Sequence, residues 1–210
     1  MNEIAEETLR MYGRTKREIS IYEEYEEAIW PVEVDQGQLQ QVLLNLFVNA
    51  GQAMPGGGDL TLVTNNVILG AHEAKEFGLP PARYVRISIS DTGQGIDEGT
   101  RQRIFEPFFT TKERGHGTGL GLASAYGIIQ NHQGTIDVNS RVGEGTTFYI
   151  YLPASEKVIK DEIPFIKNNQ NGPQTVLLVD DEDVILKVGS QILQELGVHA
   201  VDCRQRERGP

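Results

Sequence analysis

The sequence has almost no cysteine, no long apolar run and no excess of positive charge. Its single cysteine, Cys203, has no partner for an internal disulfide. No apolar stretch approaches the roughly 20 residues that a membrane-spanning helix needs, and the chain does not open like a signal peptide. Nineteen Lys and Arg against 30 Asp and Glu give a net charge of −11, which disfavours binding to nucleic acid or anionic lipid. We therefore expect a cytoplasmic segment without membrane contact, although a longer parent protein could be anchored elsewhere.

The chain length and one polar stretch indicate the domain organisation. At 210 residues the chain can hold one full domain plus a fragment, or two small domains. Residues 154–174 are polar, contain two prolines and show no sustained apolar period, as is typical of a linker. The sequence therefore predicts a domain of residues 1–153, a linker of residues 154–174, and a short C-terminal part of residues 175–210.

Apolar residues recur at helical spacing in three segments of the first domain, and five other segments have the composition of strands. Helices are expected over residues 4–11, 38–54 and 120–130. Strands are expected over residues 18–22, 60–66, 84–90, 135–139 and 146–152. This order predicts an α/β sandwich, in which a mixed β-sheet carries helices on one face.

The longest predicted helix carries polar residues on one side. Asn45, Asn49 and Ala53 are spaced four residues apart, so they project in the same direction. Asn is a poor residue for a helix interior, and amides among Leu, Val and Phe need partners. Two interpretations stay open: the amides bond to backbone, or an Asn carbonyl oxygen binds Mg²⁺, which prefers oxygen ligands.

Two glycine-containing segments indicate ligand binding. Residues 91–95, Asp-Thr-Gly-Gln-Gly, combine an acceptor-only carboxylate with glycines that permit close approach of a ligand, but an ordinary Asp/Gly turn explains them equally well. Residues 115–122, Gly-His-Gly-Thr-Gly-Leu-Gly-Leu, lead into a helix, so their N–H groups and the helix N-terminus favour a phosphate chain. The second segment is neither a Rossmann fingerprint nor a P-loop.

An aromatic cluster followed by a cation lies between these segments, in residues 104–112, Ile-Phe-Glu-Pro-Phe-Phe-Thr-Thr-Lys. Such a cluster is more often local core than a binding site. It is also a candidate anchor for one end of a lid that closes over a nucleotide.

In this order, the motifs resemble the ATP-site boxes of histidine kinase catalytic domains, within the wider ATPase superfamily (GHKL type) that includes type II topoisomerases and the MutL repair proteins. The resemblance covers residues 2–153, and five motifs in sequence are far more specific than any one. The matching segments are residues 45–54, 91–97, 104–112, 115–122 and 143–148. The resemblance implies a site for ATP and Mg²⁺ under a lid.

Carried over by position, the resemblance implies a role for each motif residue. Asn49 would ligate Mg²⁺, and Asp91 would accept the adenine amine. The adenine pocket would be shaped by Gly93, Gly95 and Ile96 and supported by Thr146, while Asn45 and Ala53 would line the helix face. The phosphates would be cradled by Gly117, Thr118, Gly119, Leu120, Gly121 and Leu122.

Two positions depart from the family pattern. Gln52 stands where many relatives carry Lys or Arg near the phosphates, and Lys112 is a candidate for supplying that charge. Hydrolytic relatives carry a Glu general base one turn before the Mg²⁺ ligand, whereas this chain has Asn45, and an amide cannot take up a proton at neutral pH. Phosphoryl transfer to a protein nucleophile therefore fits better than efficient ATP hydrolysis.

The resemblance implies a nucleophile outside this chain, because such kinases phosphorylate a His before Glu or Asp on a two-helix dimerisation domain. Of the four histidines only His72 precedes an acidic residue, and we expect it in a surface loop; His132 is expected to cap a helix. No residue is assigned as catalytic. The expected partner is the histidine-containing dimerisation domain of a longer parent kinase, and the isolated fragment is expected to be a monomer.

The C-terminal part resembles the opening of a response-regulator receiver domain. Residues 175–182, Thr-Val-Leu-Leu-Val-Asp-Asp-Glu, and the amphipathic stretch that follows look like its first strand, acidic cluster and first helix. The resemblance implies a truncated, partial βαβ receiver fragment in which Asp180 and Asp181 belong to an incomplete Mg²⁺ site. A helix N-cap cluster is the alternative interpretation of these acidic residues, and the receiver interpretation is preferred.

Two functional hypotheses remain. In the first, the chain is the catalytic part of a hybrid histidine kinase that donates the γ-phosphoryl group of Mg·ATP to a histidine in two-component signal transduction, with a response-regulator receiver as a further partner. In the second, it is a nucleotide-responsive binding module without phosphotransfer. A third option, a hydrolytic ATPase of the same superfamily, is disfavoured by Asn45.

Overall fold

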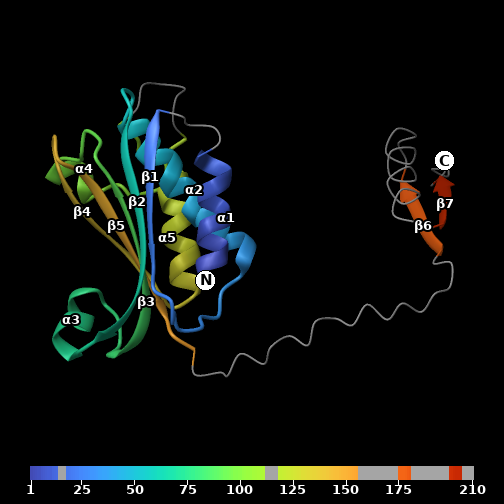
Figure 1. Ribbon diagram of the computed structural model, residues 1–210, viewed down its shortest axis with the longest axis horizontal. Coiled ribbons are helices and arrows are strands. Elements are labelled where there is room, and N and C mark those ends of the chain that lie inside the picture. The colour runs from blue at the N-terminus through green and yellow to red at the C-terminus, as the bar shows by residue number, and fades with distance from the viewer. Residues whose placement is uncertain (14–17, 112–117, 156–174, 181–198, 205–210) are drawn as a thin grey trace, which may run out of the picture. The chain divides into compact units, whose positions relative to one another are not determined.

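The computed structural model describes residues 1–13, 18–111, 118–155, 175–180 and 199–204 (Figure 1). The chain divides into two compact units, Met1–Ile159 and Lys160–Pro210.

The first unit is built on a mixed five-stranded sheet with the strand order β1-β2-β3-β5-β4. Only β1 and β2 are parallel neighbours, and the other pairs are antiparallel. The strands are β1 (Ile19–Tyr25), β2 (Gly58–Leu69), β3 (Ala82–Asp91), β4 (Thr135–Arg141) and β5 (Gly145–Pro153). All five predicted strands are present, each longer than the apolar alternation alone indicated.

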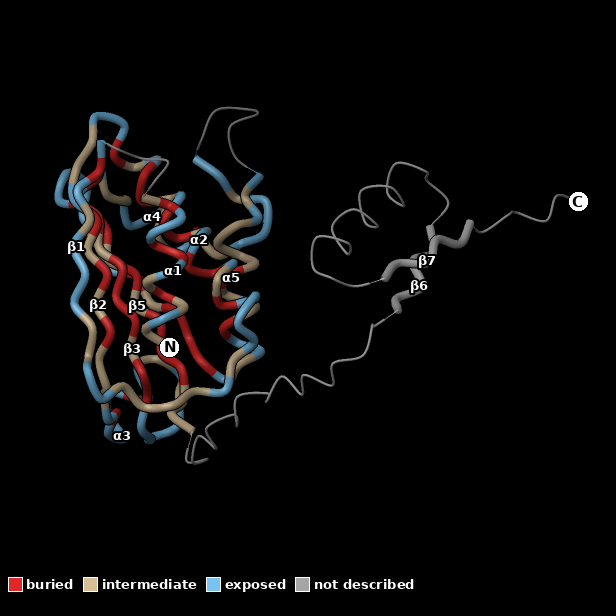
Figure 2. Tube along the Cα trace, turned by 45° about the vertical axis from the view of Figure 1, so that its right-hand side comes forward, coloured by how far each residue is buried: buried red, intermediate tan, exposed pale blue. Residues whose placement is uncertain are grey.

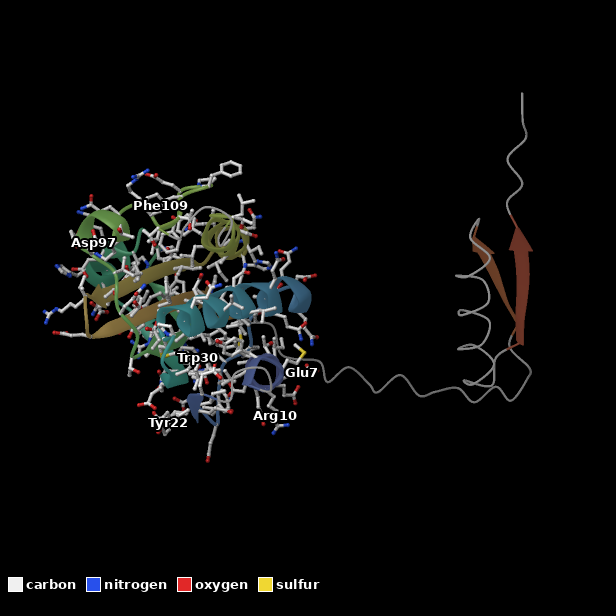
Figure 3. All side chains as sticks on the ribbon, turned by 90° about the horizontal axis from the view of Figure 1, so that it is seen from above. Glu7, Arg10, Tyr22, Trp30, Asp97 and Phe109 are labelled. Atoms are coloured by element: carbon white, nitrogen blue, oxygen red, sulfur yellow. The ribbon has the colours of Figure 1, made fainter. Side chains whose placement is uncertain are left out.

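Three helices cover one face of this sheet (Figure 1): α1 (Asn2–Gly13), α2 (Gln36–Ala53) and α5 (Gly121–Asn131). Helix α2 packs between the other two, as Figure 3 also shows. It begins where Asp35 caps it, because the Asp35 carboxylate accepts a hydrogen bond of 2.8 Å from the backbone N–H of Gln38. The predicted sandwich with helices on one face is confirmed.

Alternate strand residues point toward the helices and fill the core, which Figure 2 shows as buried stretches along the strands. On β3, Val85, Ile87 and Ile89 are buried, and Ile87 and Ile89 belong to the same hydrophobic cluster as Leu46 and Phe47 of α2. Side chains of a strand alternate between faces, so Asp91 at the end of β3 continues this inward series. An acidic residue therefore stands where the pattern would place an apolar one.

The opposite face of the sheet carries a short helix that the sequence did not predict. Helix α3 (Ala71–Glu76) packs at one end of this face with Leu69, Tyr84 and Tyr151. The expectation that His72 lies in a loop is therefore wrong: it lies in α3, and its side chain is 92% exposed. The carboxylate of Glu73 accepts the N–H of Gly70 at 3.1 Å, a local capping signal that could have identified the helix.

A further short helix, α4 (Glu98–Arg101), follows the 91–97 segment and was also not predicted. In the second unit, β6 (Thr175–Asp180) pairs in parallel with β7 (His199–Arg204). The predicted strand at residue 175 is present. The amphipathic stretch expected to be a helix lies outside the described residues.

Candidate functional site

The predicted site residues of β3 and β5 meet at one end of the sheet. Asp91 and Thr146 are partners in the β3–β5 register, and they are 7% and 4% exposed. Residues directly opposite one another in an antiparallel pair project from the same face, so both side chains lie on the helix side. The structure thus brings together two residues that are far apart in the sequence.

Asp91 is a buried acceptor. Burial raises the pKa of its carboxyl group above the ordinary value, and backbone hydrogen bonds from Gly93 and Thr146 act in the opposite direction. The N–H of Gly93 donates to Asp91 Oδ1 over 2.9 Å. When ionised, such a group accepts hydrogen bonds only, so it is suited to bind a ligand that donates from an amine.

The segment after Asp91 is shaped by backbone contacts that require glycine. A Cβ atom at Gly93 would lie 2.7 Å from both the Cβ and the carbonyl oxygen of Ala53, at the end of α2. The neighbouring N–H of Gln94 donates to that same carbonyl over 3.0 Å. At Gly95 the φ angle is +69°, and a Cβ would overlap the carbonyl oxygen of Arg141. Gly93 therefore lies in close contact with Ala53, which was predicted to line the helix face, and Gly95 packs on the backbone of Arg141.

The sequence did not identify Ser140 of β4, although this residue joins three parts of the site. Its Oγ atom lies 2.8 Å from the backbone N of Ile96, 2.9 Å from the carbonyl oxygen of Gly145, and 2.9 Å from Thr146 Oγ1. The available signal was weak: Ser140 continues the inward series of Ile136 and Val138, where the alternation calls for another apolar residue. Its partner at Ile96 is 44 positions away.

The polar side of α2 faces the start of α5. Asn45 Nδ2 donates to the carbonyl oxygen of Gly121 over 3.1 Å, so the first of the two amides bonds to backbone. One turn further along α2, Asn49 is half-buried, and Gln52 is exposed after another turn. Helix α2 and helix α5 contain no charged residue. Backbone N–H groups at the start of α5 are thus presented beside uncharged amides.

The two ends of the predicted lid are held together. Phe108 N donates to the carbonyl oxygen of Gly119 over 2.9 Å, and a Cβ at Gly119, whose φ is +65°, would overlap the backbone of Phe108. Phe105 packs on Tyr126 with ring centroids 5.0 Å apart, while Phe108 is 75% exposed. The aromatic cluster is therefore partly local core. Of the predicted phosphate residues, Lys112 and Gly117 lie outside the described residues.

The remaining phosphate residues follow in order at the start of α5. The Leu120 N–H donates to Thr118 Oγ1 over 3.4 Å, Leu120 caps the helix, and Gly121 begins it. Leu122 is half-buried against the core. Figure 3 places Phe109 near α5 and Asp97 beside α4, both on the side of α2 away from α1.

No preformed metal site made of charged ligands is present in the part of the chain that the structure describes: no three His, Cys, Asp or Glu side chains cluster there. Asn49 is the predicted ligand in the first unit. In the second, Asp180 is the last residue of β6, and Asp181 lies outside the described residues. Among the described residues, no helix is long and apolar enough to cross a membrane.

A buried acidic acceptor, a glycine turn packed on the end of α2, and the N-terminus of α5 thus lie on the helix-covered side of an α/β sandwich. Residues 34–156 match the family model described as histidine kinase-, DNA gyrase B-, and HSP90-like ATPase. The chain belongs to this family.

The relatives narrow the kind of ATPase. The chain is 46% identical over 179 residues to the sensor kinase CckA of Brucella abortus (strain 2308), covering 80% of this chain and 19% of that protein. It is 35% identical over 157 residues to the sensor histidine kinase ZraS of Escherichia coli (strain K12), covering 74% and 30%. The catalytic domain of histidine kinase ThkA, in a nucleotide-free form, aligns with a TM-score of 0.60 and 30% identity, covering 73% of this chain and 92% of that one.

Residues 34–156 therefore form a histidine kinase-type ATPase domain, of the kind found in these sensor kinases of two-component systems. The chain spans less than a third of the length of these two curated relatives.

Proposed function

We propose that this chain binds Mg·ATP at the sheet end and donates the γ-phosphoryl group to a histidine on a dimerisation domain. The observation that carries the proposal is Asp91, a buried acceptor beside a glycine turn that packs on the end of α2. The adenine amine would donate to this carboxylate, with Gly93 and Gly95 keeping the backbone close, Ile96 beside them and Thr146 next to Asp91.

The other end of the site suits phosphates and Mg²⁺. Asn49 would offer its carbonyl oxygen to Mg²⁺, and phosphate oxygens and water would supply the other ligands, as Mg²⁺ commonly accepts. The N-terminal end of α5, from Thr118 to Leu122, would receive the phosphates through backbone N–H groups, with Gly117 and Lys112 contributing from the lid. Gln52 lies exposed one turn beyond Asn49, where it can contact the phosphates.

Transfer to a protein is favoured over hydrolysis. Asn45 cannot act as a general base, and its Nδ2 donates to Gly121, so this amide holds the start of α5 in place. We expect an ATP turnover number well below ~1 s⁻¹ for the chain alone.

Two histidines of the first unit, His72 and His132, are poor phosphoacceptors for this site. His132 caps α5: its Nδ1 lies 2.8 Å from the Ile128 carbonyl oxygen, and its Nε2 accepts the Asp35 N–H over 3.1 Å. Both ring nitrogens are therefore engaged. His72 is exposed on α3, which packs on the opposite face of the sheet from Asp91. This supports our proposal that the acceptor lies on a separate dimerisation domain.

The second unit supports a receiver-type partner within the same parent protein. Parallel neighbours β6 and β7 are the arrangement of a βαβ unit, and Asp180 lies at the carboxyl end of β6, where such folds place ligand-binding groups. We propose that this unit opens a receiver domain, with Asp180 and Asp181 in its Mg²⁺ site.

Labelled ATP tests the proposal against a binding module without phosphotransfer. The chain is mixed with a separately produced dimerisation domain carrying the His-Glu or His-Asp motif, and with γ-³²P-ATP and Mg²⁺. Label on the dimerisation domain supports the kinase function. The label should be lost when Asp91 is replaced by Ala, and it should be kept when Asp137, on the outer face of the sheet, is replaced by Ala. Tight ATP binding without any labelled histidine would instead support the binding module.

A further inference from the structure

Ser140 has all of its hydrogen-bonding capacity committed. A serine hydroxyl has one proton and two acceptor lone pairs. The Ile96 N–H, 2.8 Å away, must donate to Ser140 Oγ, and the Gly145 carbonyl oxygen, 2.9 Å away, must accept its proton. The third neighbour, Thr146 Oγ1 at 2.9 Å, can then bond only by donating its own proton to the remaining lone pair. The three contacts fix the direction of each bond.

This assignment determines what Thr146 can offer to a ligand. Its proton points to Ser140, so its oxygen presents only lone pairs. Its cross-strand partner Asp91, when ionised, also accepts only. The inner face of the sheet end therefore presents two neighbouring acceptors and no hydroxyl donor from Thr146.

A carboxylate alone does not decide which purine binds. Adenine offers a donor at its C6 amine, whereas hypoxanthine offers a donor at N1–H and an acceptor at its C6 carbonyl, and Asp91 can accept from either donor. The second acceptor, Thr146 Oγ1, distinguishes the two bases. Beside the C6 carbonyl of hypoxanthine it would place two lone pairs facing each other, which is unfavourable.

We infer that Ser140 is a positioning residue that holds the Thr146 hydroxyl as an acceptor and so makes the base site select a C6 amine over a C6 carbonyl. The inference rests on the proposed nucleotide function, and it assigns to Ser140 a role in the specificity of that site for adenine. The amine has two hydrogens, so one can bond to Asp91 and the other can bond to Thr146, directly or through water.

The surroundings of Ser140 keep this arrangement in place. The Gly143 N–H donates to the Gln94 carbonyl oxygen over 2.8 Å, which ties the β4–β5 turn to the segment after Asp91. Gly145, with φ at +100°, lies so close to Asp91 that a Cβ would overlap the Asp91 carbonyl oxygen. These contacts hold together the two backbone segments to which Ser140 Oγ bonds, at Ile96 and at Gly145.

The sheet provides a matched control on its other face. Ser90 Oγ and Thr147 Oγ1 are also 2.9 Å apart, on the register pair adjacent to Asp91 and Thr146. Ser90 and Thr147 point away from the helices. Removing their hydrogen bond therefore removes a Ser–Thr bond of the same distance as the one between Ser140 and Thr146, without altering the inner face of the sheet.

Calorimetry on the full 210-residue chain measures the dissociation constants of Mg·ATP and Mg·inosine triphosphate. The ratio of the dissociation constant for Mg·inosine triphosphate to that for Mg·ATP measures the preference for adenine. For the unaltered chain we expect a ratio of about 100 or more, since a site built around hydrogen bonds rejects a mismatched analogue strongly. Ser140→Ala should lower this ratio by about tenfold, because Thr146 can then rotate and donate to the C6 carbonyl. Ser140→Thr, which keeps the hydroxyl, should restore the ratio, and Ser90→Ala should leave it unchanged.

Two further measurements separate positioning from a purely structural role. Thr146→Val removes the hydroxyl and should lower the ratio even if Ser140→Ala does not fold. In the Thr146→Val background, Ser140→Ala should have no additional effect on the ratio.

An unchanged ratio in Ser140→Ala, or equal weakening of both nucleotides, would overturn the inference while the nucleotide function stands. Absence of ATP binding by the unaltered chain would overturn both.

Discussion

The two ends of the candidate site are built differently. At the base end, formed by Asp91, Gly93, Gly95, Ser140 and Thr146, the side chains that bond are buried or half-buried and are fixed by backbone atoms. At the phosphate end, formed by Asn45, Asn49, Gln52 and the start of α5, the helices contribute amides and N–H groups but no charge. On the proposed function, we therefore expect selectivity for the base to reside in the sheet, and affinity for the phosphates to depend on Mg²⁺ and on cations outside these two helices.

The sharpest test of the base end is Asp91→Ala. The variant leaves the adenine amine without its buried acceptor, so we expect Mg·ATP affinity to fall by about 100-fold or more. Asp137, a half-buried acidic residue on the outer face of β4, gives the control Asp137→Ala, which should bind normally. Calorimetry measures the Mg·ATP affinity of both variants. If Asp91→Ala and Asp137→Ala bind Mg·ATP with the same affinity, the assignment of the base end is wrong.

Gly95→Ala tests whether the base end is fixed by backbone packing. The substitution forces a Cβ into the Arg141 carbonyl oxygen at a φ of +69°, so we expect the free energy of unfolding to fall by about 2 kcal/mol or more. Gly127→Ala is the matched control, because nothing lies within 4 Å of its Cβ position in α5. There the helix should gain about 0.5–1 kcal/mol. Urea unfolding in the absence of nucleotide measures both, and a stable Gly95→Ala protein would contradict the packing argument.

Asn49→Ala should affect the phosphate end through the metal. Removing one Mg²⁺ ligand is expected to weaken Mg·ATP binding by about tenfold, close to 1.4 kcal/mol. With EDTA in place of Mg²⁺, the variant and the unaltered chain should bind ATP alike. A loss of affinity that is the same with and without Mg²⁺ would show that Asn49 acts in another way.

The smallest expected effect is on the stability of the nucleotide-free protein. Burial raises the pKa of Asp91 above its ordinary value of 3.8, so the folded chain takes up this proton more readily than the unfolded chain. The ionised carboxylate therefore destabilises the fold above its folded pKa, and this cost disappears as the pH falls below the unfolded value. Asp91→Asn can still accept the Gly93 N–H without charge. Its melting temperature should exceed that of the unaltered chain at pH 7, and the difference should shrink toward pH 4.

Sequence patterns predicted most of the fold, because the sheet and the three large helices repeat apolar residues at regular spacing. They missed α3 and α4, which are six and four residues long and too short to show a period. The strands were predicted too short, since pairing at their polar ends depends on a neighbour that the local sequence does not reveal.

The candidate site was predicted only where it lies in continuous motifs. The contact of Gly93 with Ala53 and the pairing of Asp91 with Thr146 arise from the fold, although each residue was named from its own motif. Ser140 was missed because its link to the segment after Asp91 is a bond to Ile96, 44 positions away, which no local pattern reveals. For the two amides of α2 the sequence left open a bond to backbone or a bond to Mg²⁺. Asn45 does bond to the backbone, at Gly121, and the Mg²⁺ role of Asn49 stays a prediction.

The hydrogen bond between Phe108 and Gly119 has a consequence for how the lid can vary. It brings together the ends of the ten intervening residues, 109–118, at a point of contact that does not depend on what lies between them. For a flexible loop, doubling the length costs only about 0.6 kcal/mol of closure entropy. We therefore expect a few residues inserted between Phe108 and Gly119 to leave the contacts of Asp91, Ser140 and Thr146 unchanged, since none of these three residues belongs to the segment.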